Sequence, residues 1–430
     1  MGRKASDKRA TNGTDHDGQD GYDLIVRDVR IFRQAGGRQD IGIRKDRIEA
    51  VGRSLAARGK VEIDGKGALA CPGLVDAHVH LDKGMLTDRC NERIQTLDEM
   101  IHIMRRLKKE CTVDDVHSRM RRGALEGLAR GTVAMRTNVE ADPFFEMKAV
   151  DASLRLRDDL KGLMELQTIA FPQDGWFSTD GTLEAGCEPF VEEAIGRGID
   201  LVGGNVNRGL WPSDPDAQVD RIFEIAKKYD RGVDAHVDNS DNAATFSLPY
   251  VAKKTLEHGY EGRVTVGHVA SLRLVPPHLA DQTIRLAAQA RLHVGVQPTR
   301  IEVAPVRKLL DAGVNVFVGS DEVMGIYTRT GVGDQVMTMW LLSLVTHLCT
   351  DEDYDEIMTM ATYNAARAMN LKDYGVARGC VADLVLFDGT SAAEVICYQR
   401  GRRAVIKGGR LVARDGELLP EVRRQMGISG

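Results

Sequence analysis

The chain lacks the features that would place it at once in a membrane or nucleic-acid class. It has no uninterrupted apolar run of the roughly 18–20 residues that span a bilayer, so we expect no transmembrane helix. Its formal net charge is only −5, which gives no electrostatic reason to expect nucleic acid or an anionic membrane as a partner. The composition, 43% apolar and 28% charged, is that of an ordinary soluble globular protein.

Paired cysteines and a secretory signal are also missing. The cysteines are dispersed and form no Cys-x-x-Cys pair, so we expect thiols that remain reduced inside the cell. Residues 1–21 are polar and lack the apolar core of a signal peptide, which predicts a disordered tail. A cytoplasmic location follows as the expectation. The seven cysteines occupy positions 71, 90, 111, 187, 349, 380 and 397.

The chain does have the length for more than one structural unit. At 430 residues it exceeds the usual limit of a single core, so one large barrel plus a smaller module is expected. Short β-strand patterns separated by Gly and charged turns fill residues 22–64, and similar patterns return at 382–413. We therefore expect residues 22–70 and 371–418 to form one small β-sandwich from both chain ends.

Residues 71–370 alternate between strand and helix patterns. A strand leading to His78 is followed by seven more candidates, at 133–136, 165–170, 201–206, 232–236, 263–269, 292–296 and 314–319. Helices are expected between and after them, over 112–130, 149–160, 220–229, 305–312 and 354–369. Eight strands alternating with helices predict an α/β fold, a distorted (β/α)8 or TIM barrel, whose active site lies at the carboxyl ends of the strands.

Two histidines, His78 and His80, stand one residue apart at the end of the first barrel strand. Side chains at i and i+2 of a strand point to the same side, so both rings can face one metal ion. An isolated pair of this kind is more often two unrelated histidines. Its significance therefore depends on further metal-binding side chains downstream.

Such side chains follow at three other strand ends. His236 ends one predicted strand, His268 ends the next, and Asp321 with Glu322 follows the last one. Each has an ordinary structural explanation when taken alone, such as a capped loop or a solvated turn. Together, at the carboxyl ends of a candidate barrel, histidines and a carboxylate suit Zn²⁺ or Fe²⁺ with a position left for water.

These residues carry a resemblance to a known family. From about Tyr22 to Val412 the chain resembles the amidohydrolase superfamily, in its cytosine deaminase branch, and is similar to triazine-ring enzymes of that branch. The motifs that carry the resemblance are Pro72 to Lys83, Ala170 to Gly175, Gly259 to Thr265, Gly319 to Asp321 and Ala382 to Val385.

The resemblance implies roles for particular residues, carried over position by position. It implies a single catalytic metal, Zn²⁺ or alternatively Fe²⁺, with His268 beside it as a hydrogen-bond donor to the activated water or the developing oxyanion. Gln173 would bind the polar edge of a substrate ring, and Lys83 matches a lysine of the triazine enzymes. The implied metal ligands are His78, His80, His236 and Asp321, and Asp321 would also transfer a proton.

The chain departs from the branch at Asn239, where cytosine deaminases carry a proton-shuttling glutamate. An asparagine neither binds nor releases a proton in the working pH range, which argues against ordinary cytosine deamination. The adjacent Asp238 is the candidate replacement for the shuttle. Tyr327 stands where cytosine deaminase has a pocket tryptophan. With Gln173 and Lys83, the residues Asn239, Glu322 and Tyr327 complete the predicted substrate-binding set.

The leading interpretation is a metal-dependent hydrolase that cleaves a C–N bond of a small nitrogen heterocycle or cyclic amide through metal-activated hydroxide. One alternative is hydrolytic removal of an exocyclic N-alkyl, carbamate or urea group, which Asn239 and Lys83 favour. A second alternative is a non-catalytic binding or scaffold protein. Because oligomers are common among relatives, the resemblance also implies a homo-oligomer.

Overall fold

The computed structural model describes most of the chain that follows the N-terminal segment. Residues 1–20, most of the predicted tail, lie outside the described residues, and so does Tyr327. The described ranges are 21–90, 92, 97–173, 175–177, 186–206, 215–240, 242–244, 246–299, 303–326 and 331–428.

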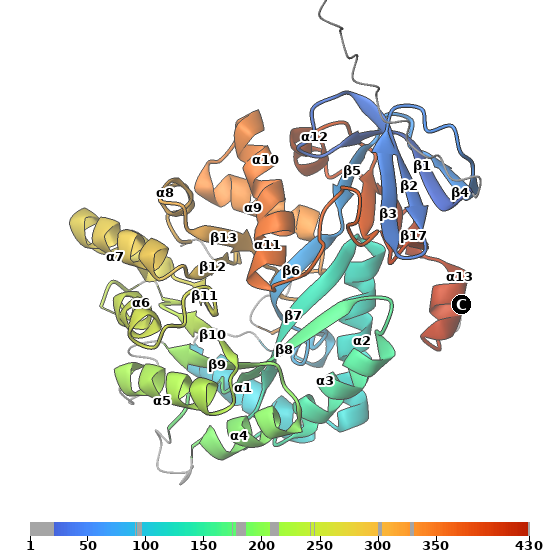
Figure 1. The fold of residues 1–430 in the computed structure, drawn as a ribbon. Helices are drawn as coiled ribbons and strands as arrows, with labels where there is room; N and C mark the ends of the chain where they lie inside the picture. The colour runs from blue at the N-terminus through green and yellow to red at the C-terminus, as the bar shows by residue number, and fades with distance from the viewer. Residues whose placement is uncertain are drawn as a thin grey trace, which may run out of the picture.

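Eight parallel strands lie in chain order in one curled barrel sheet (Figure 1), which confirms the predicted (β/α)8 fold. Each strand pairs with the next one in chain order. After the eighth strand the chain turns into the short β14 (Asp321–Glu322), which pairs with the first strand and closes the ring. The eight strands are β6 (Leu74–His80), β7 (Thr132–Glu140), β8 (Glu165–Phe171), β9 (Leu201–Val206), β10 (Gly232–Val237), β11 (Val264–His268), β12 (His293–Val296) and β13 (Asn315–Val318).

Helices follow the strands and cover the outside of the barrel (Figure 1). They do so because each has one apolar face: in α2, for example, buried residues recur at Val116, Met120, Ala124 and Leu128. These side chains belong to one large apolar core shared with the outward faces of the strands. The helices are α2 (Val113–Ala129), α3 (Lys148–Asp159), α4 (Glu188–Arg197), α5 (Pro215–Lys228), α6 (Leu248–Glu257), α7 (Pro277–Gln289), α8 (Val306–Asp311) and α9 (Gln335–Thr346).

Strand β7 shows how the barrel positions polar groups. All of its residues are buried, and Met135 and Val139 lie in the apolar core with the surrounding helices. Side chains alternate along a strand, so Arg136 and Glu140 point to the opposite face, into the barrel. They are four residues apart, which places Arg136 toward the amino end of the barrel and Glu140 at its carboxyl end.

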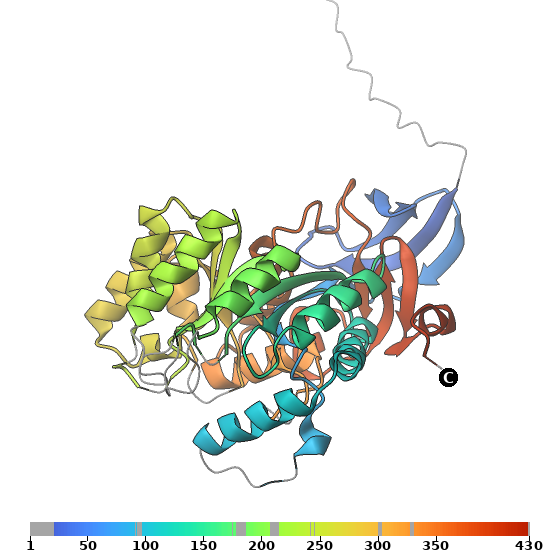
Figure 2. The ribbon, with the colours of Figure 1, turned by 90° about the horizontal axis from the view of Figure 1, so that it is seen from below.

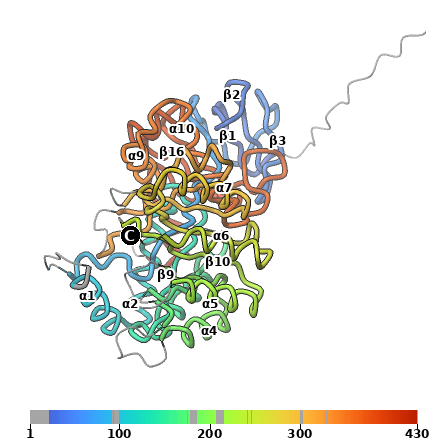
Figure 3. The backbone as a smooth tube through the Cα atoms, turned by 90° about the vertical axis from the view of Figure 1, so that its left-hand side faces the viewer, coloured from blue at the N-terminus to red at the C-terminus, as the bar shows by residue number. Residues whose placement is uncertain are grey.

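A second sheet is built from both chain ends, as expected. It joins β1 (Tyr22–Ile31) to β5 (Leu69–Pro72), and β5 pairs with β15 (Leu384–Phe387) from the far end of the chain. The sheet folds around its own apolar cluster and lies away from α4 and α5 in Figure 3. Its other strands are β2 (Arg38–Arg44), β3 (Arg47–Gly52), β4 (Gly59–Asp64), β16 (Arg402–Lys407), β17 (Arg410–Arg414) and β18 (Glu417–Leu418).

An inserted segment separates the first barrel strand from α2. It contains η1 (Thr87–Arg89) and α1 (Leu97–Glu110), and α1, cyan in Figure 2, projects from the barrel. Ile103, Met104 and Leu107 of α1 pack in a small apolar cluster of their own with Leu86 and Ile326. The segment is therefore attached to the carboxyl end of the barrel, because Ile326 follows β14.

The remaining short elements include one departure from the expected pattern. The single helix predicted over 354–369 is instead α10 (Asp351–Thr359), a π-helical turn η3 (Met360–Asn364) and α11 (Ala365–Ala368). The Thr350 hydroxyl and the Asp353 carboxylate form a reciprocal capping box that starts α10 three residues before the predicted boundary. The other elements are η2 (Ala270–Arg273), α12 (Ala392–Cys397) and α13 (Pro420–Gln425).

Whether a helix can cross a membrane depends on its length and its apolar character. Within the described ranges, none of the helices combines the length and the apolar character needed to cross a bilayer.

Candidate metal centre

Four side chains from three strands converge at the carboxyl end of the barrel: one ligand atom from each lies within 4.8 Å of every other. The Nε2 atoms of two of the histidines are 2.9 Å apart. The Asp321 Oδ1 atom lies 3.5 Å from His78 Nε2 and 3.7 Å from His80 Nε2. Ligand atoms held tetrahedrally at about 2.1 Å from Zn²⁺ are separated by about 3.4 Å, so these spacings fit one metal ion. The four residues are His78, His80, His236 and Asp321.

The hydrogen bonding of His78 supports the same interpretation. Its ring is fully buried, and neither ring nitrogen has a hydrogen-bond partner among the described residues. Buried polar atoms are nearly always paired, and an unpaired imidazole nitrogen is costly unless something else binds it. The donor set of three histidines and one carboxylate suits Zn²⁺ or Fe²⁺, so the residues present fit the implied metal.

Two glycines make room for the His78 side chain. A Cβ atom at Gly267 of β11 would come within 2.6 Å of the His78 ring, and one at Gly319 would come within 2.8 Å of His78 Cβ. Separations below 3.0 Å essentially do not occur for real Cβ atoms. Both positions therefore need glycine for His78 to lie where it does.

The turn that carries Asp321 is hydrogen-bonded to the first barrel strand, β6. The Ser320 hydroxyl donates to Asp76 Oδ2 at 2.5 Å, and the Ser320 backbone N–H donates to Asp76 Oδ1 at 3.2 Å. Asp76 lies on β6, two residues before His78, and is completely buried. This contact joins the two strands that carry three of the four candidate ligands.

The electrostatics of the cluster match what metal ligands require. Burial, with the charge of Lys83 added, lowers the pKa of His80 well below its usual value, and burial with His78 does the same for His236. Burial alone would raise the pKa of Asp321, but the neighbouring His268 and His78 outweigh it and hold that pKa below its usual range. Neutral imidazoles and an ionised carboxylate are the protonation states that bind a metal.

His268 lies beside the four candidate ligands. Its Nε2 atom is 3.9 Å from Asp321 Oδ1, and its ring centroid is 4.7 Å from that of His236. The backbone is left-handed at His268 (φ 72°), at the β-branched Val269 (φ 43°) and at Asp321 (φ 65°). Aspartate and histidine tolerate this conformation, but it is strained for the β-branched Val269, and such strain is often found at functional sites.

Three residues of the predicted substrate-binding set also lie together. The Lys83 ammonium donates to Gln173 Oε1 at 2.7 Å, and Lys83 Nζ is 4.0 Å from Glu322 Oε1. Lys83 follows His80 by three residues, and Glu322 follows Asp321 directly. The cluster is therefore next to the candidate metal ligands. Asn239, half-buried, follows Asp238 at the end of β10.

Asp238, the predicted proton shuttle, accepts hydrogen bonds from the backbone at the start of α6. One carboxylate oxygen accepts the Ser247 backbone N–H at 2.6 Å and the other accepts that of Leu248 at 3.0 Å. These contacts hold the start of α6 and are a helix-capping arrangement. The shuttle role remains a prediction, and the hydrogen bonding also gives Asp238 a structural role.

Residues that the sequence interpretation missed lie close to Lys83. Glu140 Oε1 is 3.2 Å from Lys83 Nζ, and Glu140 Oε2 forms an ion pair with Lys108 of α1. Glu140 could have been found, since β7 runs on to it beyond the predicted end at residue 136. No signal in the sequence points to Lys108, because it reaches the site from an inserted helix.

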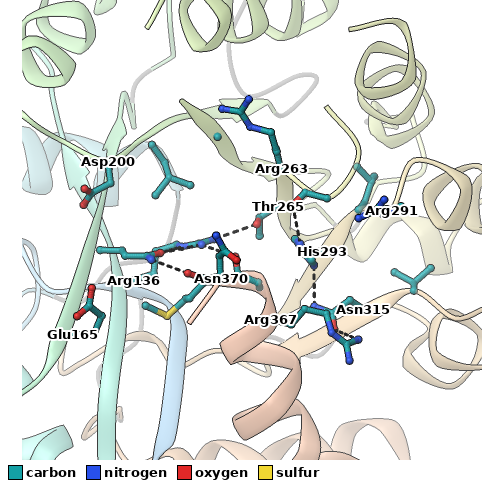
Figure 4. Close-up of a pocket in the computed structure, with 18 of the residues that line it drawn as sticks. Arg136, Glu165, Asp200, Arg263, Thr265, Arg291, His293, Asn315, Arg367 and Asn370 are labelled. Carbon is teal, nitrogen blue, oxygen red and sulfur yellow. Dashed lines mark hydrogen bonds between the residues drawn. The ribbon is translucent and has the colours of Figure 1, made fainter. Parts of the chain in front are cut away.

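A cavity lies at the opposite, amino end of the barrel (Figure 4). Its volume is about 720 Å³, and arginines from several elements line it. Arg136 crosses the floor, donating to Asp234 Oδ2 at 2.9 Å, to Thr265 Oγ1 at 3.1 Å and to the Ala368 carbonyl at 2.6 Å. These contacts pair the N–H donors of Arg136 with acceptors of the protein itself. We therefore interpret Arg136 as a structural residue of this cavity.

Comparison with known proteins agrees with the fold and the site. The chain matches the amidohydrolase family over residues 69–412. It is 32% identical over 401 residues to N-isopropylammelide isopropyl amidohydrolase of Pseudomonas sp. (strain ADP), covering 92% of this chain and 98% of that protein. It is 27% identical over 400 residues to pterin deaminase of Rhizobium rhizogenes, covering 89% and 88%.

Solved structures show the same relationship. N-isopropylammelide isopropylaminohydrolase from Burkholderia multivorans superposes with a TM-score of 0.83 at 30% identity, covering 92% of this chain and 99% of that one. The 5-methylcytosine deaminase of Klebsiella pneumoniae superposes with a TM-score of 0.84 at 24% identity, covering 91% and 97%, which is evidence for the fold.

A (β/α)8 barrel that carries three histidines and an aspartate at its carboxyl end defines a class of metal-binding barrel hydrolases. Within that class, the chain belongs to the amidohydrolase family, which confirms the resemblance seen in its motifs. It is an enzyme that hydrolyses carbon–nitrogen bonds. The non-catalytic scaffold alternative has no support in these findings.

Proposed function

We propose that the enzyme cleaves a C–N bond of a small nitrogen heterocycle or a related cyclic amide, using one divalent metal. The observation that carries this proposal is the convergence of ligand atoms within 4.8 Å at the carboxyl end of the barrel. Nearly full-length relatives whose names include a triazine-derivative amidohydrolase and a pterin deaminase support the substrate class. The proposed metal ligands are His78, His80, His236 and Asp321.

A bound divalent metal would supply the main chemical activation, because it lowers the pKa of a water molecule from 15.7 to roughly 7–9. The remaining steps fall to side chains of the protein. Asp321 Oδ2 accepts a hydrogen bond from the Thr299 hydroxyl at 3.2 Å, which orients the carboxylate. Asp321 would then take a proton from the attacking water and pass it to the leaving nitrogen.

His268 would stabilise the negative charge that develops on the attacked group. Its Nε2 atom faces Asp321, and its backbone N–H donates to Gln297 Oε1 at 2.9 Å, which holds the residue at the strand end. A donor that is already in place stabilises an oxyanion without rearrangement during the reaction. We assign His268 to this role.

We expect Zn²⁺ as the metal, with Fe²⁺ as the alternative. Three histidines and one carboxylate form a common Zn²⁺ site with an open position, and the same donors accept Fe²⁺. A structural neighbour, the atrazine chlorohydrolase of Arthrobacter aurescens, was solved in complex with zinc and superposes with a TM-score of 0.72 at 20% identity.

A second candidate reaction is hydrolytic removal of an exocyclic N-alkyl, carbamate or urea group. Asn239 favours it, because an asparagine cannot supply the proton transfer that the branch's glutamate performs for a ring nitrogen. The name of the relative at 32% identity, an isopropyl amidohydrolase, is consistent with this reaction. The substrate-contacting residues would be the same: Lys83, Gln173, Asn239 and Glu322, with Tyr327 proposed from the sequence.

The test begins with metal analysis of the purified protein and continues with a substrate panel. Aminopyrimidines, N-alkylated triazines and ureas are compared while ammonia and amine release are followed separately. Ammonia release identifies deamination, and amine release identifies removal of an N-alkyl group. Less than about half an equivalent of bound metal, with no turnover after loading with Zn²⁺ or Fe²⁺, would refute the proposal.

We also propose that the enzyme is a cytoplasmic homo-oligomer. All seven cysteines are unbridged, as expected for a reducing compartment. Helix α9 exposes Trp340 and Leu344, which are 38% and 52% exposed, on one side of the molecule. Light scattering after size-exclusion chromatography measures the mass directly, and a monomer at micromolar concentration would contradict the oligomer.

A further inference from the structure

Helix α9 differs from the other helices that surround the barrel, because none of its 12 residues is charged. An outer helix normally presents charged and polar side chains to water, as α2 does with the exposed Asp114 and Arg122. The outward side chains of α9 are apolar instead, and Trp340 and Leu344 are both exposed. The outer face of α9 therefore lacks the polar surface that contact with water alone would favour.

Further exposed apolar side chains gather around this face. Seven large apolar side chains are exposed in the described part of the chain, and four of them are on or beside α9. Of these four, Val332 precedes the helix, and Tyr398 ends α12, which packs against α9 (Figure 1). The adjacent Gln399 Nε2 donates to the Val336 carbonyl of α9 at 3.4 Å. With two half-buried residues of α9, they form what we call the α9 surface: Val332, Met337, Trp340, Leu341, Leu344 and Tyr398.

The size of the α9 surface fits one specific contact between proteins. Tyr398 is 71% exposed, and with Trp340, Leu344 and Val332 it presents roughly 400 Å² of apolar area to water. A standard protein interface buries about 800 Å² on each partner, of which roughly 56–65% is apolar. Four side chains thus provide most of the apolar area that one side of such an interface needs. Apolar patches of this size on soluble proteins are often interaction sites.

The charges around the α9 surface distinguish the candidate occupants. A helix that lies on an anionic membrane carries Lys or Arg on its polar side, whereas α9 has neither and is followed by the exposed Asp351 and Glu352. The N-terminal residues 1–20 contain only one methionine and two alanines as apolar residues, so they cannot cover the surface. A second copy of the chain presents the same uncharged face. Two chains of net charge −5 repel least where they meet through such a face.

We propose that the α9 surface is the contact between two copies of this chain, which pack α9 against α9 about a two-fold axis. A two-fold contact pairs a surface with itself, so one patch on each copy is sufficient. The axis passes near Trp340, in the middle of the helix, and the two helices run antiparallel, the direction that their dipoles favour. Leu344 of one copy then faces Met337 of the second copy. This inference rests on the homo-oligomer proposed above and assigns its contact surface.

Leu344→Glu tests the contact, because it places a carboxylate in the apolar interface from both copies. The mass measured by light scattering after size-exclusion chromatography should fall to half the wild-type value at micromolar concentration. The dissociation constant of the contact should rise at least about 100-fold, since a buried carboxylate without a partner is unfavourable. Leu344 is 52% exposed in the single chain, so the fold should survive. Circular dichroism and metal content check this.

A pair of variants at Trp340 tests the two-fold axis itself, because a residue near the axis faces its own counterpart. Trp340→Glu and Trp340→Lys should each have half the wild-type mass, since like charges then meet across the contact. An equimolar mixture of the two variants should recover the wild-type mass, because opposite charges meet. Only a contact between copies of this chain produces such recovery.

A matched control places the same charge on another exposed apolar residue. Leu256 lies on α6 and is 36% exposed, close to the exposure of Trp340. Leu256→Glu should keep the wild-type mass and metal content. A loss of mass in this variant would show that any added negative charge separates the copies, and would remove the support for the α9 surface.

Three further results would overturn the inference. They are the wild-type mass in folded Leu344→Glu and Trp340→Glu, a mixture of the Trp340 variants that stays at half mass, and binding to vesicles of phosphatidylcholine and phosphatidylglycerol that Leu344→Glu abolishes. A multimeric wild type whose α9 variants keep their mass refutes the inference alone. A wild type that is monomeric at micromolar concentration refutes the proposed homo-oligomer itself.

Discussion

The two ends of the barrel bury the same kinds of side chain and satisfy them differently. At the amino end, His293 Nδ1 is 2.9 Å from the Asn315 amide nitrogen and His293 Nε2 is 3.3 Å from the Gly262 carbonyl. At the carboxyl end, both ring nitrogens of the buried His78 lack a hydrogen-bond partner within the described part of the chain. A histidine with complete hydrogen bonds is structural, whereas one without them is suited to bind a ligand.

Single strands show the same contrast along their length. Strand β10 presents Asp234 to Arg136 at the amino end and His236 to the candidate ligands at the carboxyl end. A cavity of about 720 Å³ lies at the amino end, where the arginine on its floor is already paired (Figure 4). The presence of a cavity therefore does not by itself identify the reactive end, whereas the hydrogen bonding of the buried side chains distinguishes the two ends.

The largest expected effect is the loss of metal and turnover when a histidine at the carboxyl end is removed, in comparison with removal of a histidine at the amino end. His236→Ala should lower bound Zn²⁺ from about one equivalent to below about 0.1, and turnover should fall at least about 1000-fold, because a ligand is lost. His293→Ala is the matched control and should keep its metal. Metal analysis of both proteins decides the matter. Retention of metal by His236→Ala, or its loss from His293→Ala, would break the comparison.

The second largest effect is a loss of stability when the buried ion pair of Arg136 and Asp234 at the amino end is broken. Arg136→Met leaves the carboxylate of Asp234 buried without its cation, which should cost about 3–5 kcal/mol of unfolding free energy. Urea unfolding measures this loss. Arg136→Met/Asp234→Asn should recover part of it, since the unpaired charge is gone. If Arg136→Met unfolds at the wild-type urea concentration, the pair is not structural.

A third prediction concerns how the stability of the protein depends on pH through His293, at the amino end of the barrel. Burial, together with Arg136, lowers the pKa of His293 to about 4, from 6.5 for an exposed histidine. The folded state thus binds the proton less well than the unfolded state, so its stability is complete above pH 6.5 and falls as the pH drops toward 4. We expect this group to cost about 2 kcal/mol between pH 7 and pH 5.

The variant His293→Gln supplies the comparison, because its side chain stays neutral over this range. Its unfolding free energy should therefore depend less on pH than that of the wild type, by about the same 2 kcal/mol. Urea midpoints at pH 7 and pH 5 provide the measurement. Parallel pH profiles for the two proteins would show that His293 is not held neutral in the fold.

The smallest effect is expected at Asp238, a buried acid at the reactive end with a structural arrangement. Asp238→Asn weakens the cap of α6 and should cost about 1 kcal/mol of stability. Turnover should stay within about threefold of the wild type if the role of the carboxylate is to accept the two backbone N–H groups at the start of α6. A loss beyond about 100-fold, with metal retained, would restore Asp238 as the proton shuttle.

Much of the barrel could be predicted because its strands have local signatures. The predicted strand 201–206 coincides with β9, and 165–170 differs from β8 by one residue. Strand β7 was predicted too short, ending at residue 136, because Thr137, Asn138 and Glu140 interrupt the apolar pattern. Those polar residues are stable in a strand only because they meet partners inside the barrel, which a local pattern does not reveal.

The residues of the candidate site also fall into two groups, those that the local sequence predicts and those that it does not. His78, His80, His236 and Asp321 each mark the end of a strand, so residue type and periodicity suffice to propose them as one group. Asp238 could not be assigned this way, because the direction of its carboxylate depends on where α6 begins. Tyr327 lies outside the described residues, and its place in the pocket stays a prediction.

By itself the sequence determined the family, the barrel and the residues at its strand ends, because these depend on chemistry and spacing over short stretches of chain. Only the tertiary structure decided which buried groups are paired. It brought Lys108 of α1 to Glu140 of β7, and Lys83 to Gln173 ninety residues away. Pairings between distant segments follow from packing of the whole barrel, and they distinguish the end that binds a ligand from the end that is already complete.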